Sequence, residues 1–511
     1  MAAGEFGLAR SQDRGETARR WTVFQSPTVA LVGVVAVIGV VIRVALYRSS
    51  VGAMSADEAV LGLMVRHALS GEFTTFLWGT AYGGPQEVWL TVPIFWVAGS
   101  SLFALRSVPF ALDAITALLV WRLGRRTIGA RPAIVAGALY WIWPPAAIFL
   151  HGRQAGFYAS DDFYCVLTLL LVLRVVERLT IARVAPLGLV LGLAFWQTSQ
   201  VFPLELAAVV WLVWRRAAVL RLAWVAAPLA LLGALPWIVW NAGHHWASLH
   251  LVSGAQSSYL WRLRLLASPV LPAALGLRRP SSEWLLPFGV AAAIYMGLVV
   301  LFALGVFRAR HREASLLYTV VAAFPLLIAL SPKTFTTDTR YLCVVMPVFA
   351  LLLAQVATTY ARSALLLALA LGVSFVSLHD TVSAFDPMLG RGTVPPRSIR
   401  PLLSALERLH VNRAYADYWI AYRIDFDSNE RIVAVENKFD RLVEEGADVV
   451  PVHDPFLRYQ RYEDEVRRSR HGFVFFRSTL PSLEFLTTLK RYHYGRHVVQ
   501  SFVVYARPAA E

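Results

Sequence analysis

Apolar runs of membrane-spanning length recur between residues 28 and 379, and no other feature of the sequence constrains the fold as strongly. Of the 511 residues, 57% are hydrophobic and only 16% are charged. The runs are roughly 15–22 residues long, which is about the length of helix that crosses the hydrocarbon core of a bilayer. The sequence therefore predicts an α-helical polytopic membrane protein.

Arginines gather between the apolar runs, in segments such as RLGRRTIGAR and FRARHRE. The formal net charge of +15 would by itself suit a protein that binds nucleic acid. Cytoplasmic loops of membrane proteins carry the same excess of basic residues, so topology explains the charge without a nucleic-acid partner. We expect residues 1–27 to form a cytoplasmic tail because they are basic, and we expect the first apolar run to be a retained anchor because no pattern of small residues typical of signal-peptide cleavage follows it.

The arginine-rich loops set the direction of each predicted span. With the N-terminus inside, about eleven spans place all of these loops in the cytoplasm. Residues 51–104 then form an external loop, whose apolar part is interrupted by Pro85 and Pro93 and so suits interfacial or re-entrant helices. The expected spans are residues 28–48, 106–123, 132–150, 163–179, 184–199, 202–214, 222–240, 286–307, 314–330, 341–358 and 363–379.

The chain changes character at about residue 380. Charged residues become frequent, and short β-rich runs such as RIVAV, GFVFF and HVVQSFVVYA alternate with helical patterns such as PLLSALERLH. We therefore expect residues 28–379 to form a transmembrane domain and residues 380–511 a small soluble α/β domain outside the membrane. Its aromatic residues Trp419 and Tyr422 are candidates for stacking on a sugar, although ordinary core aromatics would give the same pattern.

Polar residues concentrate on the predicted outer face. A carboxylate at a membrane boundary that is partly buried can acquire a pKa suited to a general base, and cations at the same depth can hold a lipid phosphate. Together they suit attack of a hydroxyl group on a sugar whose leaving group is a lipid phosphate. The candidates are Asp57, Glu58 and Glu87 from the first external loop, Arg153, Asp161 and Asp162 from the second, and Lys333, Arg340 and Tyr341 from SPKTFTTDTRY.

Each of these groups also has a purely structural interpretation. SADE, residues 55–58, could be a helix N-cap followed by acidic first-turn residues. YASDD could cap the next span in the same way, and two adjacent acids point in different directions. Arg340 and Tyr341 could be an interfacial anchor pair.

Four motifs in order resemble the GT-C superfamily of integral-membrane glycosyltransferases, in particular the protein O-mannosyltransferases, the lipid A aminoarabinose transferase and the actinobacterial mannosyl- and arabinosyltransferases. These motifs are SADE after the first span, GGPQEVWLTVPIFWVAG, LRSVPFALDAITALLVWRLGRR and DTRYLCVVMPVFALLL. The resemblance covers residues 28–380. One departure is Glu87, which stands where the family usually has an apolar residue.

The resemblance implies a GT-C-like fold and a role for each candidate. Asp57 aligns with the base that deprotonates the acceptor hydroxyl, and Glu58 is its neighbour. Arg153, Lys333 and Arg340 lie on loops where relatives bind the lipid phosphate, although only Arg340 lies on a matching motif. The donor would be a polyprenyl-phosphate sugar, a hexosyl or pentosyl group would be transferred with inversion, and the acceptor would be a glycan, lipid or protein hydroxyl.

Other functions keep the same architecture. A transporter or flippase of a lipid-linked or small polar substrate is the alternative, because charges within a membrane also mark substrate pathways. A scaffold for cell-envelope assembly would tolerate loss of Asp57. The proposed chemistry requires no cofactor, although an acid-rich loop could recruit a divalent metal. The expected location is the plasma membrane, with the C-terminal domain on the outer side.

Overall fold

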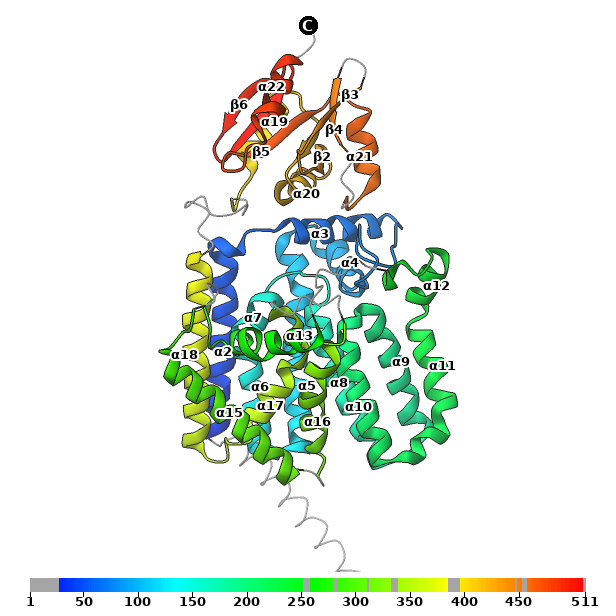
Figure 1. Ribbon diagram of the computed structural model, residues 1–511, viewed down its shortest axis with the longest axis vertical. Coiled ribbons are helices and arrows are strands. Elements are labelled where there is room, and N and C mark those ends of the chain that lie inside the picture. The colour runs from blue at the N-terminus through cyan, green and yellow to red at the C-terminus, as the bar shows by residue number, and fades with distance from the viewer. Residues whose placement is uncertain are drawn as a thin grey trace, which may run out of the picture.

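The structure, a computed structural model, describes residues 27–250, 258–279, 283–309, 312–331, 339–384, 396–445, 448–452 and 457–508. A bundle of apolar helices makes up one part of the molecule, and a small domain with a β-sheet, here called the C-terminal domain, stands on one end of it (Figure 1). The predicted combination of membrane helices with a small α/β region is therefore confirmed.

Four helices of the described residues are long and apolar enough to cross a membrane. They are α2 (Pro27–Arg48), α5 (Leu102–Thr127), α15 (Phe288–Ala309) and α18 (Tyr360–Ala384). Two bent pairs raise the number to six: α6 (Ala130–Ile142) with α7 (Pro145–His151), bent by 64°, and α10 (Phe202–Arg215) with α11 (Ala223–Gly233), bent by 113°. Each predicted span falls on one helix or on two consecutive helices, but length and composition do not confirm a count of eleven.

Shorter helices complete the bundle. Its densest packing joins α9 to α11, where a Cβ on Gly192 would lie 1.9 Å from the carbonyl oxygen of Ala230, so only glycine permits the approach. Buried side chains such as Trp211, Tyr140 and Phe324 fill the interior of the bundle. The remaining helices are α8 (Tyr158–Glu177), α9 (Ile181–Gln197), α12 (Leu235–Gly243), α13 (Tyr259–Leu265), α14 (Leu271–Ala274), α16 (Ser315–Ile328) and α17 (Met346–Ala354), the last preceded by the 3-10 helix η6 (Thr339–Val345).

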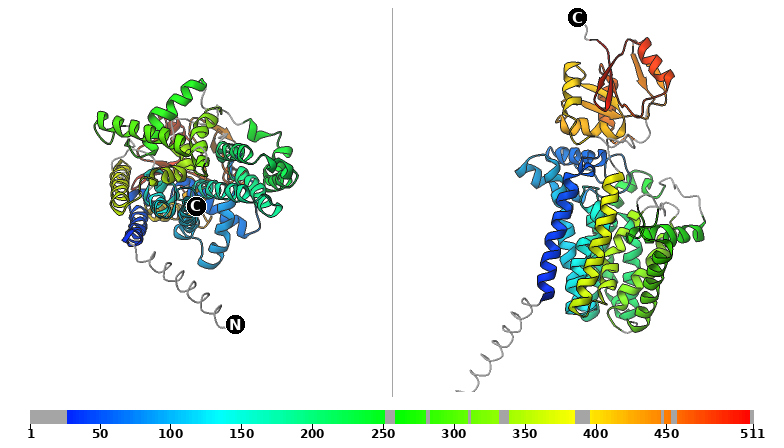
Figure 2. Two further views of the ribbon diagram at one scale, coloured as in Figure 1. Left: turned by 90° about the horizontal axis from the view of Figure 1, so that it is seen from below. Right: turned by 90° about the vertical axis from the view of Figure 1, so that its left-hand side faces the viewer.

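Two helices of the first predicted external loop lie between the bundle and the C-terminal domain, and α3 runs across the end of the bundle (Figures 1 and 2). They are α3 (Ala56–Leu69) and α4 (Gln86–Ala98), with Pro93 inside α4. Ser55 starts α3 with a capping box, in which its hydroxyl accepts from the Glu58 amide and the Glu58 carboxylate accepts from the Ser55 amide. The cap expected from SADE is thus present, and it fixes where the two acids lie.

The C-terminal domain contains a five-stranded mixed sheet in the order β2-β1-β5-β7-β6. Strand β1 pairs in parallel with β2 and β5, whereas β7 pairs antiparallel with β5 and β6. Four helices pack around this sheet and the separate hairpin β3-β4. The elements are α19 (Arg400–Arg408), β1 (Arg413–Ala416), α20 (Tyr418–Asp427), β2 (Val433–Glu436), β3 (Leu442–Glu445), β4 (Asp448–Pro451), α21 (Gln460–Arg467), β5 (Gly472–Phe476), α22 (Leu483–Arg491), β6 (Gly495–Val499) and β7 (Phe502–Ala506).

One continuous hydrophobic cluster joins the C-terminal domain to α3 and α4. It includes Leu63 of α3, Phe95 of α4, and Tyr422 and Phe473 of the C-terminal domain. Because the same buried side chains pack both parts, the domain is seated on α3 and its position is defined. Residues far apart in the sequence can therefore share one site at this junction.

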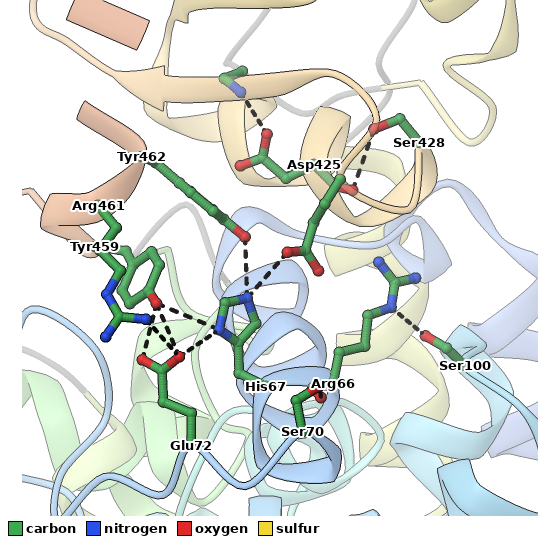
Figure 3. Close-up of polar contacts among 12 residues, drawn as sticks. Arg66, His67, Ser70, Glu72, Ser100, Asp425, Ser428, Tyr459, Arg461 and Tyr462 are labelled. Atoms are coloured by element: carbon green, nitrogen blue, oxygen red, sulfur yellow. Dashed lines mark hydrogen bonds and ion pairs between the residues drawn. The ribbon is translucent and has the colours of Figure 1, made fainter. Parts of the chain in front are cut away.

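A group of polar and aromatic side chains, here called the His67 cluster, fastens the C-terminal end of α3 to the domain (Figure 3). The two ring nitrogens of His67 each lie 3.0 Å from a carboxylate oxygen, Nδ1 from Glu72 and Nε2 from Glu430. Tyr459 donates to Glu72 over 2.9 Å and stacks on Trp78 with the ring centroids 4.0 Å apart. This contact therefore pairs charged groups and encloses them with aromatic rings.

Candidate active site

A cavity of about 850 Å³ lies at the N-terminal end of α3, at the junction of the bundle and the C-terminal domain. The bundle supplies residues from α3, α7, η6 and α18, and the C-terminal domain supplies Trp419 and Arg458. Among the residues that the structure describes, its polar lining combines one accessible carboxylate with several arginines. These residues are Asp57, Tyr82, Arg153, Arg278, Arg279, Arg340 and Arg458.

Asp57 presents its carboxylate at the rim of this cavity. Its side chain is 57% exposed, so the partial burial expected for it is not seen. The Tyr418 hydroxyl donates a hydrogen bond to Oδ1, and Nη2 of Arg458 lies 3.7 Å from the same oxygen. Two groups of the C-terminal domain therefore hold this carboxylate in place while it stays accessible to a ligand.

Glu58 points the other way, into the protein, and is 1% exposed. Arg106 of α5 donates to it from Nε over 2.6 Å and from Nη2 over 2.7 Å, and the Gln154 amide donates over 3.1 Å. Burial acts to raise the pKa of the Glu58 carboxyl, but the charge and hydrogen bonds of Arg106 outweigh it, so the pKa is lowered. Glu58 is therefore an ionised anchor that ties α3 to α5.

Arginines from separated segments line the same cavity as Asp57. Arg153, in the loop after α7, donates to the Val51 carbonyl oxygen, and its guanidinium lies 4.6 Å from the centre of the Phe149 ring. Arg279 forms an ion pair with Asp380 over 3.1 Å. Because several guanidinium groups share one concave surface with a single accessible carboxylate, the lining is suited to an anionic ligand.

The structure brings together only some of the residues predicted from the sequence. Asp57, Arg153 and Arg340 all line the cavity. Glu58 also forms part of its wall, with its side chain turned into the protein. Tyr341 does not line it, and its ring lies 5.3 Å from the Arg340 guanidinium. Lys333 lies outside the residues that the structure describes.

The other acidic candidates, Glu87, Asp161 and Asp162, are buried and do not line the cavity. Glu87 accepts from the hydroxyl of Ser160 over 2.8 Å. Asp162 accepts from Tyr140 over 3.0 Å, whereas neither carboxylate oxygen of Asp161 has a hydrogen-bond partner within the described part of the chain. As placed, these three acids cannot reach a ligand in the cavity.

Sequence reasoning missed three of the arginines. Arg278 and Arg279 stand side by side in GLRRP, at the end of a predicted external loop, and that placement could have marked them. No sequence pattern around Arg458 indicates a functional role, because this residue reaches the cavity only when the C-terminal domain packs on α3. Of the two predicted sugar-stacking residues, Trp419 lines the cavity and is 39% exposed, but Tyr422 is fully buried and packs in the core.

Histidine, cysteine, aspartate and glutamate side chains are the potential metal ligands of the chain. Within the described residues, no group of three or more histidine, cysteine, aspartate or glutamate side chains could hold a metal ion. The two cysteines, Cys165 and Cys343, are buried and are not joined in a disulfide within the described residues.

Comparison with known families and structures agrees with the resemblance seen in the motifs. Residues 83–240, less than half of the chain, match the family model described as dolichyl-phosphate-mannose-protein mannosyltransferase. No curated protein sequence gives a significant match.

Two solved structures of one protein share the fold over almost the whole length of both chains. ArnT from Cupriavidus metallidurans bound to undecaprenyl phosphate has a TM-score of 0.58 and 15% identity, covering 96% of this chain and 99% of that chain. The apo state of ArnT has a TM-score of 0.57 and 16% identity, covering 96% and 98%. The predicted resemblance to GT-C glycosyltransferases is therefore confirmed, and the apolar helices agree with a membrane protein.

Proposed function

We propose that this chain, which resembles the GT-C glycosyltransferases and shares the fold of ArnT, is an inverting glycosyltransferase. It moves a hexosyl or pentosyl group from a polyprenyl-phosphate donor to a hydroxyl group of a glycan, lipid or protein acceptor. The ArnT structure contains undecaprenyl phosphate, which supports a polyprenyl-phosphate donor here. The matching family model, named for dolichyl-phosphate-mannose, supports a sugar carried on a lipid phosphate.

One observation carries this proposal: the cavity pairs one accessible carboxylate with an excess of arginines. Asp57 and the five arginines of the lining come from the bundle and from the C-terminal domain. Guanidinium groups recognise phosphate oxygens, and a carboxylate can accept a proton from a hydroxyl group. A sugar phosphate and an acceptor hydroxyl are together the ligands that such a lining would serve.

In the mechanism we propose, Asp57 accepts the proton of the acceptor hydroxyl. The hydroxyl oxygen forms a bond to the anomeric carbon, and the bond between that carbon and the phosphate oxygen breaks, with its electron pair leaving on the phosphate. Arg153, Arg340 and Arg458 stabilise the negative charge that the departing phosphate gains. Attack opposite the leaving group inverts the configuration of the anomeric carbon.

Glu58 and Arg106 act as positioning residues in this proposal. Their buried ion pair joins the first turn of α3 to α5, and Glu58 also belongs to the capping box that starts the helix. The pair therefore fixes the direction in which the neighbouring residue, Asp57, projects. This role replaces the part in the chemistry that was expected of Glu58.

The first test measures sugar transfer from a panel of radiolabelled polyprenyl-phosphate sugars into membrane extracts. We expect Asp57→Asn to lower transfer by about 10²–10⁴-fold at matched expression, with donor binding retained, because the amide cannot accept the proton. Asp440→Asn, which removes an exposed carboxylate outside the cavity, is the matched control. Unchanged transfer by the Asp57 variant would move the base elsewhere.

The orientation in the membrane is a further part of the proposal. With the N-terminus in the cytoplasm and about eleven spans, the cavity and the C-terminal domain lie outside. Reporter fusions after residues 126, 216 and 312 should then all report a cytoplasmic location. An external signal at any of these three positions would contradict the orientation.

A transporter or flippase is the second candidate, because the bundle contains buried charged groups. Arg43 forms an ion pair with Asp113, and His151 Nδ1 lies 2.9 Å from the same carboxylate, all within the helices. Ionisable groups inside a membrane commonly mark substrate pathways. Substrate movement across vesicles without any sugar transfer would favour this function.

A further inference from the structure

A second polar cavity, here called the arginine cavity, lies at the opposite end of the bundle from the candidate active site. Its volume is about 740 Å³. It is formed by three helices, α5, α8 and α9, and plays no part in the proposed transfer reaction. The lining residues are Leu119, Arg122, Arg125, Arg126, Leu167, Leu170, Leu171, Arg174, Glu177 and Arg183.

Helix α5 connects the two sites. Arg106, near one end of α5, binds Glu58 beside the candidate active site, and Arg122 lies near the other end. At a rise of 1.5 Å per residue, these two positions are about 24 Å apart, close to the thickness of a hydrocarbon core. The arginine cavity therefore lies near the end of α5 that is remote from the C-terminal domain, at the level expected for headgroups of the leaflet on that side.

The charge of the arginine cavity is not balanced. Among the described lining residues, Glu177 is the single carboxylate, and it forms ion pairs with Arg126 and with Arg183, the second over 3.1 Å. Within the described residues, the side chains of Arg122 and Arg174 make no hydrogen bond or ion pair, and Arg125 only lies over the Trp121 ring at 5.5 Å. Three guanidinium groups are therefore available to an anion.

Four of the ten described lining residues are leucines. Leu170 and Leu171 are buried side chains of α8, and Leu119 and Leu167 are half-buried. A small hydrated anion would leave this leucine surface without a partner, whereas a phospholipid combines a phosphate with an apolar glycerol and acyl region. The combination of charge and apolar surface favours a lipid over a free anion.

We propose that the arginine cavity binds the phosphate headgroup of an anionic phospholipid of the leaflet remote from the C-terminal domain. The proposal goes beyond the transfer reaction and does not depend on it. Arginines that only set topology need no common cavity. Arg178, Arg215 and Arg221 are exposed arginines of nearby segments that do not line the arginine cavity.

The test compares two triple variants of the full-length purified protein that lose the same charge. One is R122Q/R125Q/R174Q, and the matched control is R178Q/R215Q/R221Q. Mass spectrometry of the intact protein in detergent would count bound phosphatidylglycerol and phosphatidylcholine across a concentration series. We expect the first variant to bind phosphatidylglycerol on the order of 100-fold more weakly than the control, since each arginine near a phosphate contributes about fivefold.

Two results would overturn the proposal. Equal phosphatidylglycerol binding by both triple variants would mean that these arginines serve topology alone. Complete displacement of the lipid from the wild-type protein by millimolar inorganic phosphate would identify a site for a free anion.

A variant that keeps every charge tests the same cavity independently of whether the triple variant folds correctly. Leu167→Trp fills the apolar side of the arginine cavity and should weaken phosphatidylglycerol binding about tenfold, with phosphatidylcholine binding unchanged. Unchanged phosphatidylglycerol binding in Leu167→Trp would contradict the apolar contact and hence the lipid.

Discussion

The two ends of α3 both contact the C-terminal domain, but with different chemistry. At the N-terminal end, the carboxylate of Asp57 is 57% exposed and meets Tyr418 and Arg458 at the edge of a cavity. At the C-terminal end, the His67 side chain is 17% exposed and its charged neighbours are paired and surrounded by aromatic rings. The difference indicates that the His67 cluster holds the domain in place, while the other end keeps its charges available to a ligand.

The two adjacent acids at the N-terminal end of α3 can be changed separately to test whether one serves structure and the other chemistry. We expect Glu58→Gln to lower the free energy of unfolding by about 3–5 kcal/mol, because Arg106 would stay buried without its anion. Asp57→Asn should change it by less than about 1 kcal/mol, since that side chain is exposed. Chemical unfolding of the purified variants measures both values, and equal losses would show that the acids are not divided between structure and chemistry.

A second prediction compares two arginines of the C-terminal domain, one at each end of α3. Arg458→Gln should raise the KM for the lipid-phosphate donor about 30-fold, because a charge-assisted hydrogen bond to phosphate contributes about 2 kcal/mol. Arg461→Gln is the matched control: its side chain is 75% exposed and pairs with Glu72 in the His67 cluster. A similar rise in KM in both variants would indicate a general effect of charge.

A third prediction concerns the aromatic surface that the C-terminal domain adds to the cavity. Trp419→Ala should lower kcat/KM by about fivefold, because a stacked ring contributes roughly 1 kcal/mol to holding a sugar. Trp246→Ala removes a tryptophan of similar exposure outside the cavity and should leave kcat/KM unchanged. Loss of activity in the control alone would place the sugar elsewhere.

The smallest expected effect is a pH dependence of docking at the His67 cluster. Burial acts to lower the pKa of His67, but its hydrogen bonds to Glu430 and Glu72 outweigh it, and the pKa is raised above 6.5. The His67 contribution is therefore complete below pH 6.5 and is lost as the pH rises through the raised pKa. Burial acts to raise the pKa values of Glu72 and Glu430, but the interactions with His67 outweigh it, and both pKa values are lowered from 4.5. The stabilising contribution of these two carboxylates is therefore present above pH 4.5 and is lost as the pH falls through the lowered pKa values.

The C-terminal domain should therefore bind most tightly to α3 between about pH 5 and 6.5. The gain in the free energy of this contact should be below about 1 kcal/mol, because the titrating groups are partly exposed. Hydrogen exchange of α21 measured across pH 5–8 reports this contact. His67→Gln should abolish the dependence, whereas His497→Gln, an exposed histidine on β6, should preserve it. An unaltered profile in the His67 variant would mean that the cluster acts through packing alone.

Local sequence patterns predicted the positions of most helices and of several strands. Apolar runs predicted helices in the right places because a membrane helix needs a long apolar stretch, and GFVFF and HVVQSFVVYA coincide with strands β5, β6 and β7. The bend between α6 and α7 falls at Pro144 and Pro145, which the sequence shows, whereas the crossing of α3 over the bundle depends on packing partners that no local pattern identifies. The number of spans remained a prediction for the same reason.

The candidate site was predictable only where a motif carried it. SADE marked Asp57, and the resemblance marked Arg340. Arg458 and Trp419 are far from Asp57 in the sequence, and they line the cavity only because the C-terminal domain packs on α3. Asp161 and Asp162 looked equivalent to Asp57 in the sequence. Their burial in the bundle separates them from the cavity.

The amino-acid sequence was sufficient to predict a polytopic helical membrane domain, an α/β region after residue 380, and a helix cap that places two acids in the first turn of α3. Which of these acids is accessible depends on the packing of α3 against the other helices. Successive residues of a helix project about 100° apart, so one of the pair had to face away from the other. The position of Arg106 inside the protein made Glu58 the buried partner and left Asp57 to the cavity.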